Sequence, residues 1–284
     1  MKIRLIIWLI ACLAISVFSF GELWAKLPQW LSPEGLQSHG VFHWGALGLC
    51  ILWLWLKRRD IIAKMRTGSF RLPYTLTGMV FLALAIFAPR SDDLLVFLML
   101  LGFLGIFVAI FNRASHLPSI LLAIYGFSLV FPVLMIKWLG EPSAIVTTST
   151  VTAIVRILGL PVTSEGIVLY IACRTGNTIM TTVVPGCAGY TTIGVFITLF
   201  ALMTLDIRLP LKRVWYVFLI GLAGTWLQNI IRIILSISVG YYWGAGALQS
   251  MHYNIAYIIF PLWYALFAYI YMRQAGWKRT PVKQ

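Results

Sequence analysis

The chain has 284 residues, of which 61% are hydrophobic and 11% are charged. A soluble domain of this length could not bury so much apolar surface, so the composition excludes a soluble protein and indicates an integral membrane protein. The 22 basic residues far outnumber the 8 acidic ones. This excess does not indicate nucleic-acid binding, because no basic run belongs to a soluble module and membrane proteins carry lysine and arginine in cytoplasmic loops.

About eight apolar segments predict transmembrane helices, since each approaches the length of ~20 residues that a helix needs to cross a bilayer. Their predicted bounds are 3–20, 41–56, 72–88, 94–111, 117–139, 187–205, 214–239 and 253–272. Pro132 predicts a kink in the fifth segment. Residues 25–40 contain Pro28 and Pro33 and are predicted to form a loop. We therefore expect an all-α polytopic membrane protein.

Residues 140–186 form the one long region that is not predicted to span the membrane. Apolar residues recur at helical spacing between residues 147 and 160, which predicts a short amphipathic helix on the membrane surface. The segments 167–173 and 178–184 are rich in β-branched residues and flank the turn-forming residues 174–177. That pattern predicts a β-hairpin, which delivers the chain to the sixth apolar segment.

The basic residues predict the orientation in the membrane. The loop at 57–71 carries six basic residues and one acid, and most other basic residues fall on the same side when the spans are counted. The positive-inside rule makes that side cytoplasmic. Both termini are then cytoplasmic, and residues 140–186 lie on the extracytoplasmic face of the cell membrane.

Cys187, Arg232 and His252 lie near the ends of the last three apolar segments. At a rise of ~1.5 Å per residue, each lies roughly 27–31 Å from the basic turn at the other end of its segment. That distance matches the ~30 Å thickness of the hydrocarbon core. All three residues are therefore predicted to reach the same membrane face, opposite the basic turns, where they form a candidate active site.

The chemistry of these residue types fits a cysteine nucleophile. Thiolate character is promoted by a helix N-terminus and by nearby cations, and Cys187 begins its predicted helix. The small residues that follow, Gly189 among them, leave room for a substrate backbone. His252 is the histidine closest to this unit in sequence and can act as acid or base. Arg232 can stabilise a developing oxyanion, and Asn229, one turn earlier on the same face, can orient the arginine or bind substrate.

Each of these residues also has an ordinary explanation. A cysteine at a helix start usually packs, an arginine near a helix end usually extends to lipid headgroups, and a histidine at a membrane boundary is usually interfacial. A disulfide between Cys173 and Cys187 also stays open, because both fall on the extracytoplasmic side. Such a disulfide would block the nucleophile. Cys12 and Cys50 lie within apolar segments and need no function.

The combination of Cys187-Ala-Gly, Asn229-x-x-Arg232 and His252, on the last three of about eight spans, resembles the exosortase/archaeosortase family. The resemblance covers about residues 140–272, and the stretch CAGYTTIGVF is more similar to the archaeal than to the common bacterial Cys-Ser-Gly version. It implies that the chain is a multi-pass membrane transpeptidase, unrelated in fold to soluble sortases. It further implies that Cys187, Arg232 and His252 are catalytic and that no cofactor or metal is needed.

The resemblance also implies a substrate and a mechanism. The substrate is a secreted protein with a C-terminal sorting signal, which consists of a short motif, a transmembrane helix and a basic tail. Cys187 attacks a peptide carbonyl beside the motif, and an acceptor amine, for example on a lipid, or water resolves the thioester. His252 shuttles the proton and Arg232 stabilises the oxyanion. Nucleic acid is not an expected partner.

The expected organisation is a single integral membrane domain of residues 1–284. It comprises a five-helix N-terminal part at 1–139, the extracytoplasmic segment at 140–186 and a three-helix catalytic part at 187–272. A transporter without thiol chemistry is the alternative, because it also carries a charged residue within its spans, and Gly221 and Gly224 could let helices move. A transporter should show repeat symmetry or helices broken at the midplane, whereas these polar residues gather at one face.

Overall fold

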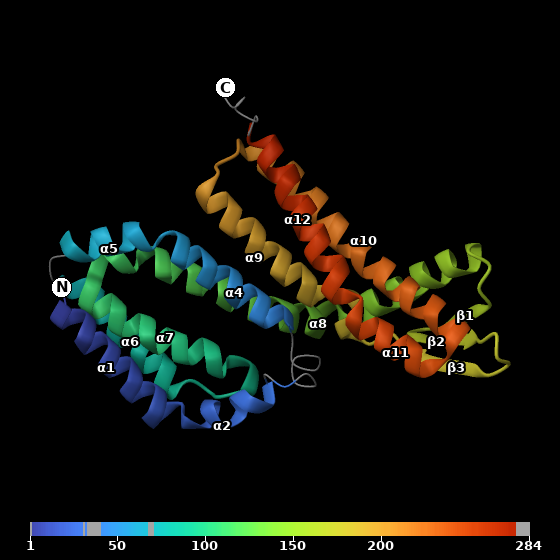
Figure 1. Ribbon diagram of the computed structural model, residues 1–284, viewed down its shortest axis with the longest axis horizontal. Coiled ribbons are helices and arrows are strands. Elements are labelled where there is room, and N and C mark those ends of the chain that lie inside the picture. Colours follow the sequence, from blue (N-terminus) through green and yellow to red (C-terminus); the bar gives the residue numbers. More distant parts are fainter. Residues whose placement is uncertain (1, 31, 33–40, 68–70, 277–284) are drawn as a thin grey trace, which may run out of the picture. The chain divides into compact units, whose positions relative to one another are not determined.

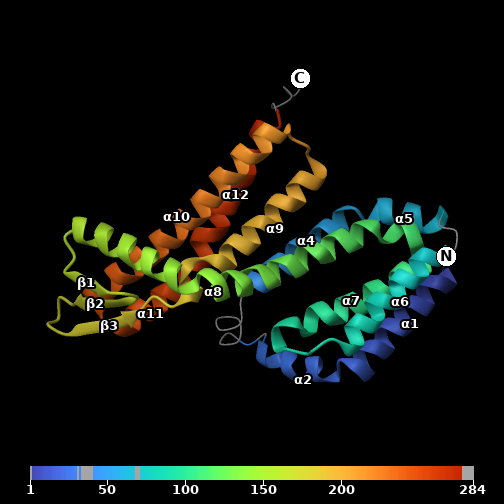
Figure 2. The same ribbon diagram turned by 180° about the vertical axis from the view of Figure 1, so that it is seen from behind.

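The computed structural model describes residues 2–30, 32, 41–67 and 71–276 (Figures 1 and 2). The chain divides into two compact units, Met1–Leu129 and Val130–Gln284. The boundary falls within helix α8 (His116–Ile157), which therefore contributes to both units.

The first unit consists of apolar helices. Its elements are α1 (Lys2–Ser19), α2 (Gly21–Trp30), α4 (Val41–Leu56), α5 (Arg58–Thr67), α6 (Leu72–Phe87), α7 (Asp92–Phe111), the 3₁₀ turn η1 (Asn112–Ser115) and the first part of α8. Helices α1, α6 and α7 lie side by side in both views (Figures 1 and 2). The backbones of α6 and α7 meet at Gly78 and Gly105, where a Cβ on Gly78 would overlap the Gly105 carbonyl oxygen. Glycine is required at this crossing because it permits the close approach.

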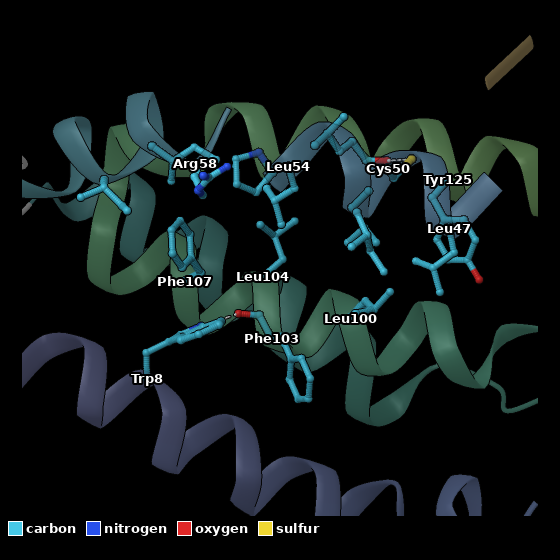
Figure 3. A pocket seen from close by; sticks show the side chains of 16 residues that line it. Trp8, Leu47, Cys50, Leu54, Arg58, Leu100, Phe103, Leu104, Phe107 and Tyr125 are labelled. Atoms are coloured by element: carbon cyan, nitrogen blue, oxygen red, sulfur yellow. Dashed lines mark hydrogen bonds between the residues drawn. The ribbon is translucent and has the colours of Figure 1, made fainter. Parts of the chain in front are cut away.

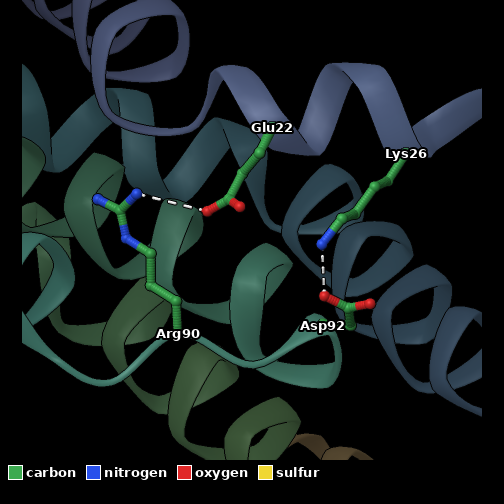
Figure 4. Close-up of polar contacts among 4 residues, drawn as sticks. All are labelled: Glu22, Lys26, Arg90 and Asp92. Carbon is green, nitrogen blue, oxygen red and sulfur yellow. Dashed lines mark hydrogen bonds and ion pairs between the residues drawn. The ribbon is translucent and has the colours of Figure 1, made fainter.

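The loop predicted for residues 25–40 is wrong for residues 25–30, which belong to α2. Leu23 is buried against Phe20 and the start of α7, and this packing stabilises a helix despite Pro28. Two ion pairs also join α2 to the segment around the start of α7. Lys26 Nζ lies 2.6 Å from Asp92 Oδ1, and Arg90 Nη1 lies 3.4 Å from Glu22 Oε1 (Figure 4). Their exposure to solvent limits what these pairs contribute to stability.

The second unit combines helices with a small sheet. After α8 come β1 (Val162–Glu165), β2 (Val168–Ala172), β3 (Thr178–Thr182), the 3₁₀ turn η2 (Pro185–Ala188), α9 (Tyr190–Asp206), α10 (Leu211–Trp243), α11 (Ala245–Asn254) and α12 (Ala256–Gln274). Helices α9, α10 and α12 lie side by side in both views, and α11 lies beside the sheet (Figures 1 and 2). The sheet and α11 therefore surround the same end of α10.

Helix α10 packs closely against its neighbours because two of its residues have no side chain. A Cβ on Gly221 would overlap the ring of Phe196 from α9, and a Cβ on Gly224 would overlap the ring of Trp263 from α12. The Trp263 indole also donates a hydrogen bond to Thr225 Oγ1 at 3.0 Å. These contacts give both glycines a packing role.

The structure contains the predicted β-hairpin and adds a strand to it. Strands β2 and β3 pair antiparallel, with Val168 opposite Thr182 and Ala172 opposite Thr178. Strand β1 pairs antiparallel with the other edge of β2, so the sheet order is β1-β2-β3. The sequence pattern does not predict β1, because its four residues, VTSE, are short and mostly polar.

The separate amphipathic helix predicted for residues 147–160 is wrong, because the chain continues α8 without interruption to Ile157. At ~1.5 Å per residue this 42-residue helix is roughly 63 Å long, about twice the hydrocarbon thickness. Part of the apolar face of its last turns packs against protein. Val151 and Val155 are fully buried in a core with Leu169 of β2 and Ile230 of α10.

All of the predicted apolar segments lie largely on helices. Within the described residues, four helical segments are long and apolar enough to cross a membrane: Lys2–Ser19, Leu94–Ile157, Leu211–Trp243 and Ala245–Gln274. Three apolar helices are shorter: Trp44–Leu56, Leu72–Phe87 and Tyr190–Asp206. These segments identify a multi-pass membrane protein, and eight crossings remain a prediction.

Candidate active site

Cys187 lies in the turn between the sheet and α9. The sequence Pro185-Gly-Cys-Ala188 forms the 3₁₀ turn η2, in which the Cys187 amide donates to the Val184 carbonyl at 2.7 Å. The chain then passes through Gly189, at φ +91°, before α9 begins at Tyr190. The left-handed conformation of Gly189 suits glycine. The thiol is therefore held just outside the N-terminus of α9, close to the helix start that the sequence predicts.

Asn229 and Arg232 lie on one face of α10, three residues apart. Asn229 is fully buried, and its Nδ2 donates to the Cys187 carbonyl at 2.7 Å. A Cβ on Gly189 would lie 3.1 Å from Asn229 Cγ. The space predicted for a substrate backbone beside Gly189 is thus occupied by the Asn229 amide, and the glycine makes room for the hydrogen bond that fixes the Cys187 turn.

His252 lies on α11 and brings its Nε2 atom between the other two residues. This nitrogen is 4.0 Å from Cys187 Sγ and 3.5 Å from Arg232 Nη2. A guanidinium can only donate, so a hydrogen bond between Arg232 and His252 requires Nε2 to be an acceptor. The nitrogen that faces the thiol then carries a lone pair. The arrangement favours the neutral tautomer, whose Nε2 lone pair can take the thiol proton when Arg232 turns its donor away.

Arg232 does not extend to lipid headgroups. Only 8% of the residue is exposed, and its Cζ lies 5.9 Å from the centre of the Phe260 ring on α12. Its Nε has no hydrogen-bond partner among the described residues, and neither has Asn229 Oδ1. One buried donor and one buried acceptor are therefore left without partners beside Cys187. Such groups are costly, so they indicate a polar ligand or bound water.

Burial raises the pKa of the Cys187 thiol, while the charge of Arg232 and the backbone hydrogen bond to Val184 lower it. Burial is the larger effect, so the site favours the protonated thiol. The thiolate character expected from a helix N-terminus and a cation is thus only partly provided. A base is needed to remove the proton, and His252 Nε2 is placed to do so.

A cavity of ≈ 40 Å³ opens next to the thiol and the imidazole. Its wall includes Thr181, Thr182 and Val183 at the end of β3. A cavity of this size holds at most a few water molecules. The sequence does not indicate these residues, because a segment rich in β-branched residues predicts a strand but not a neighbouring site.

The turn before α9 has further supports that the sequence did not indicate. Thr192 Oγ1 donates to the Gly189 carbonyl at 2.7 Å, and Tyr264 on α12 donates its hydroxyl to the Thr192 carbonyl at 2.8 Å.

Cys173 lies apart from the Cys187, His252 and Arg232 cluster. It is buried, its thiol points to the Gly240 carbonyl at 3.6 Å, and both Cys173 and Cys187 are free. The disulfide alternative is therefore not realised.

The chain is similar to one family of known proteins. A family model described as transmembrane exosortase matches residues 30–269, most of the chain. Neither the curated proteins nor the solved structures give a match. The matched region contains the whole Cys187, Asn229, Arg232 and His252 cluster and the helices that carry it. The chain therefore belongs to the transmembrane exosortase family.

Proposed function

We propose that the protein is a membrane-embedded cysteine transpeptidase that removes the C-terminal sorting signal of secreted proteins and transfers them to an acceptor. The acceptor is an amine, for example on a lipid, or water. The observation that carries this proposal is the meeting of three residues from separate elements. His252 Nε2 lies 4.0 Å from Cys187 Sγ and 3.5 Å from Arg232 Nη2. Membership of the transmembrane exosortase family supports this substrate class.

The proposed acylation follows from this geometry. His252 Nε2 takes the thiol proton as the Cys187 sulfur attacks the peptide carbonyl carbon, and a carbon–sulfur bond forms. Arg232 turns its donors to the resulting oxyanion. The tetrahedral intermediate expels the amine that leads to the substrate's transmembrane helix, and this amine receives the proton from His252. A thioester on Cys187 is the product of this half-reaction.

In the second half-reaction the acceptor amine attacks the thioester carbon. Its proton passes to His252, the carbon–sulfur bond breaks, and the proton returns to the sulfur. The result is a new amide and a regenerated thiol. No electrons are exchanged with a redox partner, and His252 ends in the form in which it began. With water as the acceptor, the same steps give a carboxylate.

The two unsatisfied buried groups support a peptide substrate. A peptide group offers one carbonyl acceptor and one N–H donor. Arg232 Nε–H is a donor for that carbonyl, and Asn229 Oδ1 is an acceptor for that N–H. The pair is thus chemically complementary to one peptide group beside the nucleophile.

The open edge of β3 supports a substrate in extended conformation. The Cys173 amide bonds to the Asn177 carbonyl, and the Val183 amide bonds to the Ile167 carbonyl. Because hydrogen-bonded pairs alternate along an antiparallel ladder, the odd-numbered residues of β3 face β2. The N–H and carbonyl groups of Thr178, Met180 and Thr182 point away from it. Among the described residues, no strand pairs with this outer edge of β3, and peptides often bind by adding a strand to such an edge.

We predict that Thr182→Pro slows cleavage about tenfold, because it removes one outward N–H from the edge nearest Cys187. The matched control is Ser164→Pro. By the same alternation, Ser164 presents its N–H on the outer edge of β1, and losing it should leave cleavage within about twofold. Cleavage rates are measured in membranes at equal protein levels. Equal rates for the two variants would show that the substrate does not pair with β3.

The proposed orientation places both termini in the cytoplasm and Cys187 on the extracytoplasmic face. It predicts that single cysteine reporters at positions 145 and 247, in a cysteine-free protein, react with an impermeant thiol reagent in intact cells. A reporter at position 64, in the basic helix α5, should react only after the cells are opened. Labelling of position 64 from outside would reverse the orientation.

The function is tested by co-expressing the protein with a secreted reporter that ends in a motif, a transmembrane helix and a basic tail. Mass spectrometry of the released reporter should show a new C-terminus between the motif and the helix. Added hydroxylamine should convert that terminus to a hydroxamate, because this small amine attacks thioesters. Cleavage that never yields a hydroxamate would argue against a covalent Cys187 intermediate.

A further inference from the structure

A second cavity lies within the first unit and has no part in the chemistry described above. It measures ≈ 360 Å³ and runs between helices α4 and α5 on one side and α7 on the other, with the first part of α8 behind (Figure 3). Its lining is almost entirely apolar and includes Trp8, Leu54, Leu100, Leu104, Phe107 and Tyr125. We refer to these residues, together with Leu47 and Arg58, as the N-terminal groove.

Among the described residues, one basic side chain lines the groove, and it lies at one end. Figure 3 shows the Arg58 guanidinium next to Leu54 and above Phe107. Arg58 Nη1 donates to the Trp55 carbonyl at 2.8 Å, and Arg58 Cζ lies 4.2 Å from the centre of the Trp55 ring. These contacts hold the side chain in place, and with respect to the described residues they use one of its five N–H donors. The guanidinium is therefore positioned to bind an anion at the end of an apolar space.

The charge around Arg58 also favours an anion. The segment 57–67 contains Lys57, Arg59, Lys64 and Arg66 in addition to Arg58, and Asp60 is its only acid. At ~1.5 Å per residue, Leu47 lies roughly 16 Å from Arg58 along the helix. That distance is about half the ~30 Å hydrocarbon core. The groove thus extends from a basic membrane surface through the depth of one leaflet.

We propose that the N-terminal groove binds one acyl chain of an anionic phospholipid, with the phosphate of the headgroup on Arg58. The length fits the hydrocarbon tail of a single leaflet, the lining fits its chemistry, and the guanidinium fits the phosphate through paired hydrogen bonds. A zwitterionic lipid fits the groove less well, because its own cation is repelled by the basic segment. This proposal does not depend on the transpeptidase activity.

The test uses the full-length protein purified in detergent and incubated with dioleoylphosphatidylglycerol or dioleoylphosphatidylcholine. Bound lipid is counted by native mass spectrometry. The parent protein should retain more phosphatidylglycerol than phosphatidylcholine. Arg58→Gln should reduce retained phosphatidylglycerol about fivefold. Arg59→Gln is the matched control, since it removes the same charge from the adjacent exposed residue, which does not line the groove, and should have little effect.

Equal losses from Arg58→Gln and Arg59→Gln would mean that the lipid binds a diffuse basic surface, which overturns the proposal. A second variant, Leu104→Trp, fills the groove without changing its charge. It should reduce retention of both lipids, with folding checked by its elution volume and melting temperature. Unchanged retention in a folded Leu104→Trp protein would place the acyl chain elsewhere. Both tests address the groove without any peptide substrate.

Discussion

Replacing Cys187 by alanine is expected to abolish cleavage of the tethered substrate while the protein remains in the membrane at its normal level. The thiol provides the only bond to the proposed acyl intermediate, and neither His252 nor Arg232 can replace it. Removal of a nucleophile in comparable catalytic units costs on the order of 10⁴-fold or more. The measurement is the fraction of reporter that has lost its transmembrane helix after a fixed time. Detectable cleavage by Cys187→Ala, at even a tenth of the parental rate, would contradict the mechanism.

Cys173→Ser is the matched control for this experiment. Cys173 is also a free thiol in the second unit, but it is buried against the Gly240 carbonyl and does not line the cavity beside His252. Serine keeps a donor for that carbonyl, so cleavage should stay within a few-fold of the parent. Equal inactivation by Cys173→Ser and Cys187→Ala would indicate that the two cysteines act together as a structural pair. The pair of variants therefore separates nucleophilic chemistry from a requirement for any thiol in this unit.

The cluster of site residues was predictable because a membrane limits where a helical residue can lie. Counting residues from the basic turns gives the depth of Cys187, Arg232 and His252, and equal depth on successive helices predicts proximity. The structure brings all three together around one imidazole nitrogen. The apolar segments were predictable for a related reason, since a long run of apolar residues in a chain of this composition forms a helix wherever it is placed.

The contacts that hold the site were not predictable. No sequence pattern indicates that Asn229 bonds to the Cys187 carbonyl or that Gly189 makes room for it, because these residues are far apart in the chain. The packing of the last turns of α8 was unpredictable for a similar reason. The apolar spacing of residues 147–160 gives an amphipathic face, but it does not tell whether that face meets lipid or protein. In the structure, Val151 and Val155 of this face pack against the sheet and α10, and so contact protein.

The local propensity of the residues was also insufficient to predict the secondary structure where tertiary contacts override it. Pro28 indicates a break, yet Leu23 packs into the core of the first unit and α2 persists to Trp30. Strand β1 has little strand-forming character of its own and exists because β2 offers it an edge. It occupies one edge of β2, and so leaves the edge of β3 as the free edge nearest the nucleophile.

Arg232→Lys is expected to insert normally and to cleave at least ~100-fold more slowly than the parent, the scale on which loss of one oxyanion donor acts. Lysine keeps the charge and the apolar stem. It lacks the planar fork that reaches His252 Nε2 through Nη2, and it lacks the Nε–H that is free to bind a substrate carbonyl. Because Arg232 is buried beside Phe260, lysine cannot recover these contacts through water.

The measurement is single-turnover cleavage in membranes with protein levels matched to the parent. Arg156→Lys is the control, because Arg156 also uses its Nε, in a 2.7 Å hydrogen bond to the Val162 carbonyl, but it lies on the exposed end of α8. Its replacement removes an arginine fork from the same unit without touching Cys187 or His252. If Arg232→Lys cleaves as fast as Arg156→Lys, a positive charge alone suffices at this position and the oxyanion role is wrong. If only Arg232→Lys is slow, the geometry of the guanidinium is what the reaction requires.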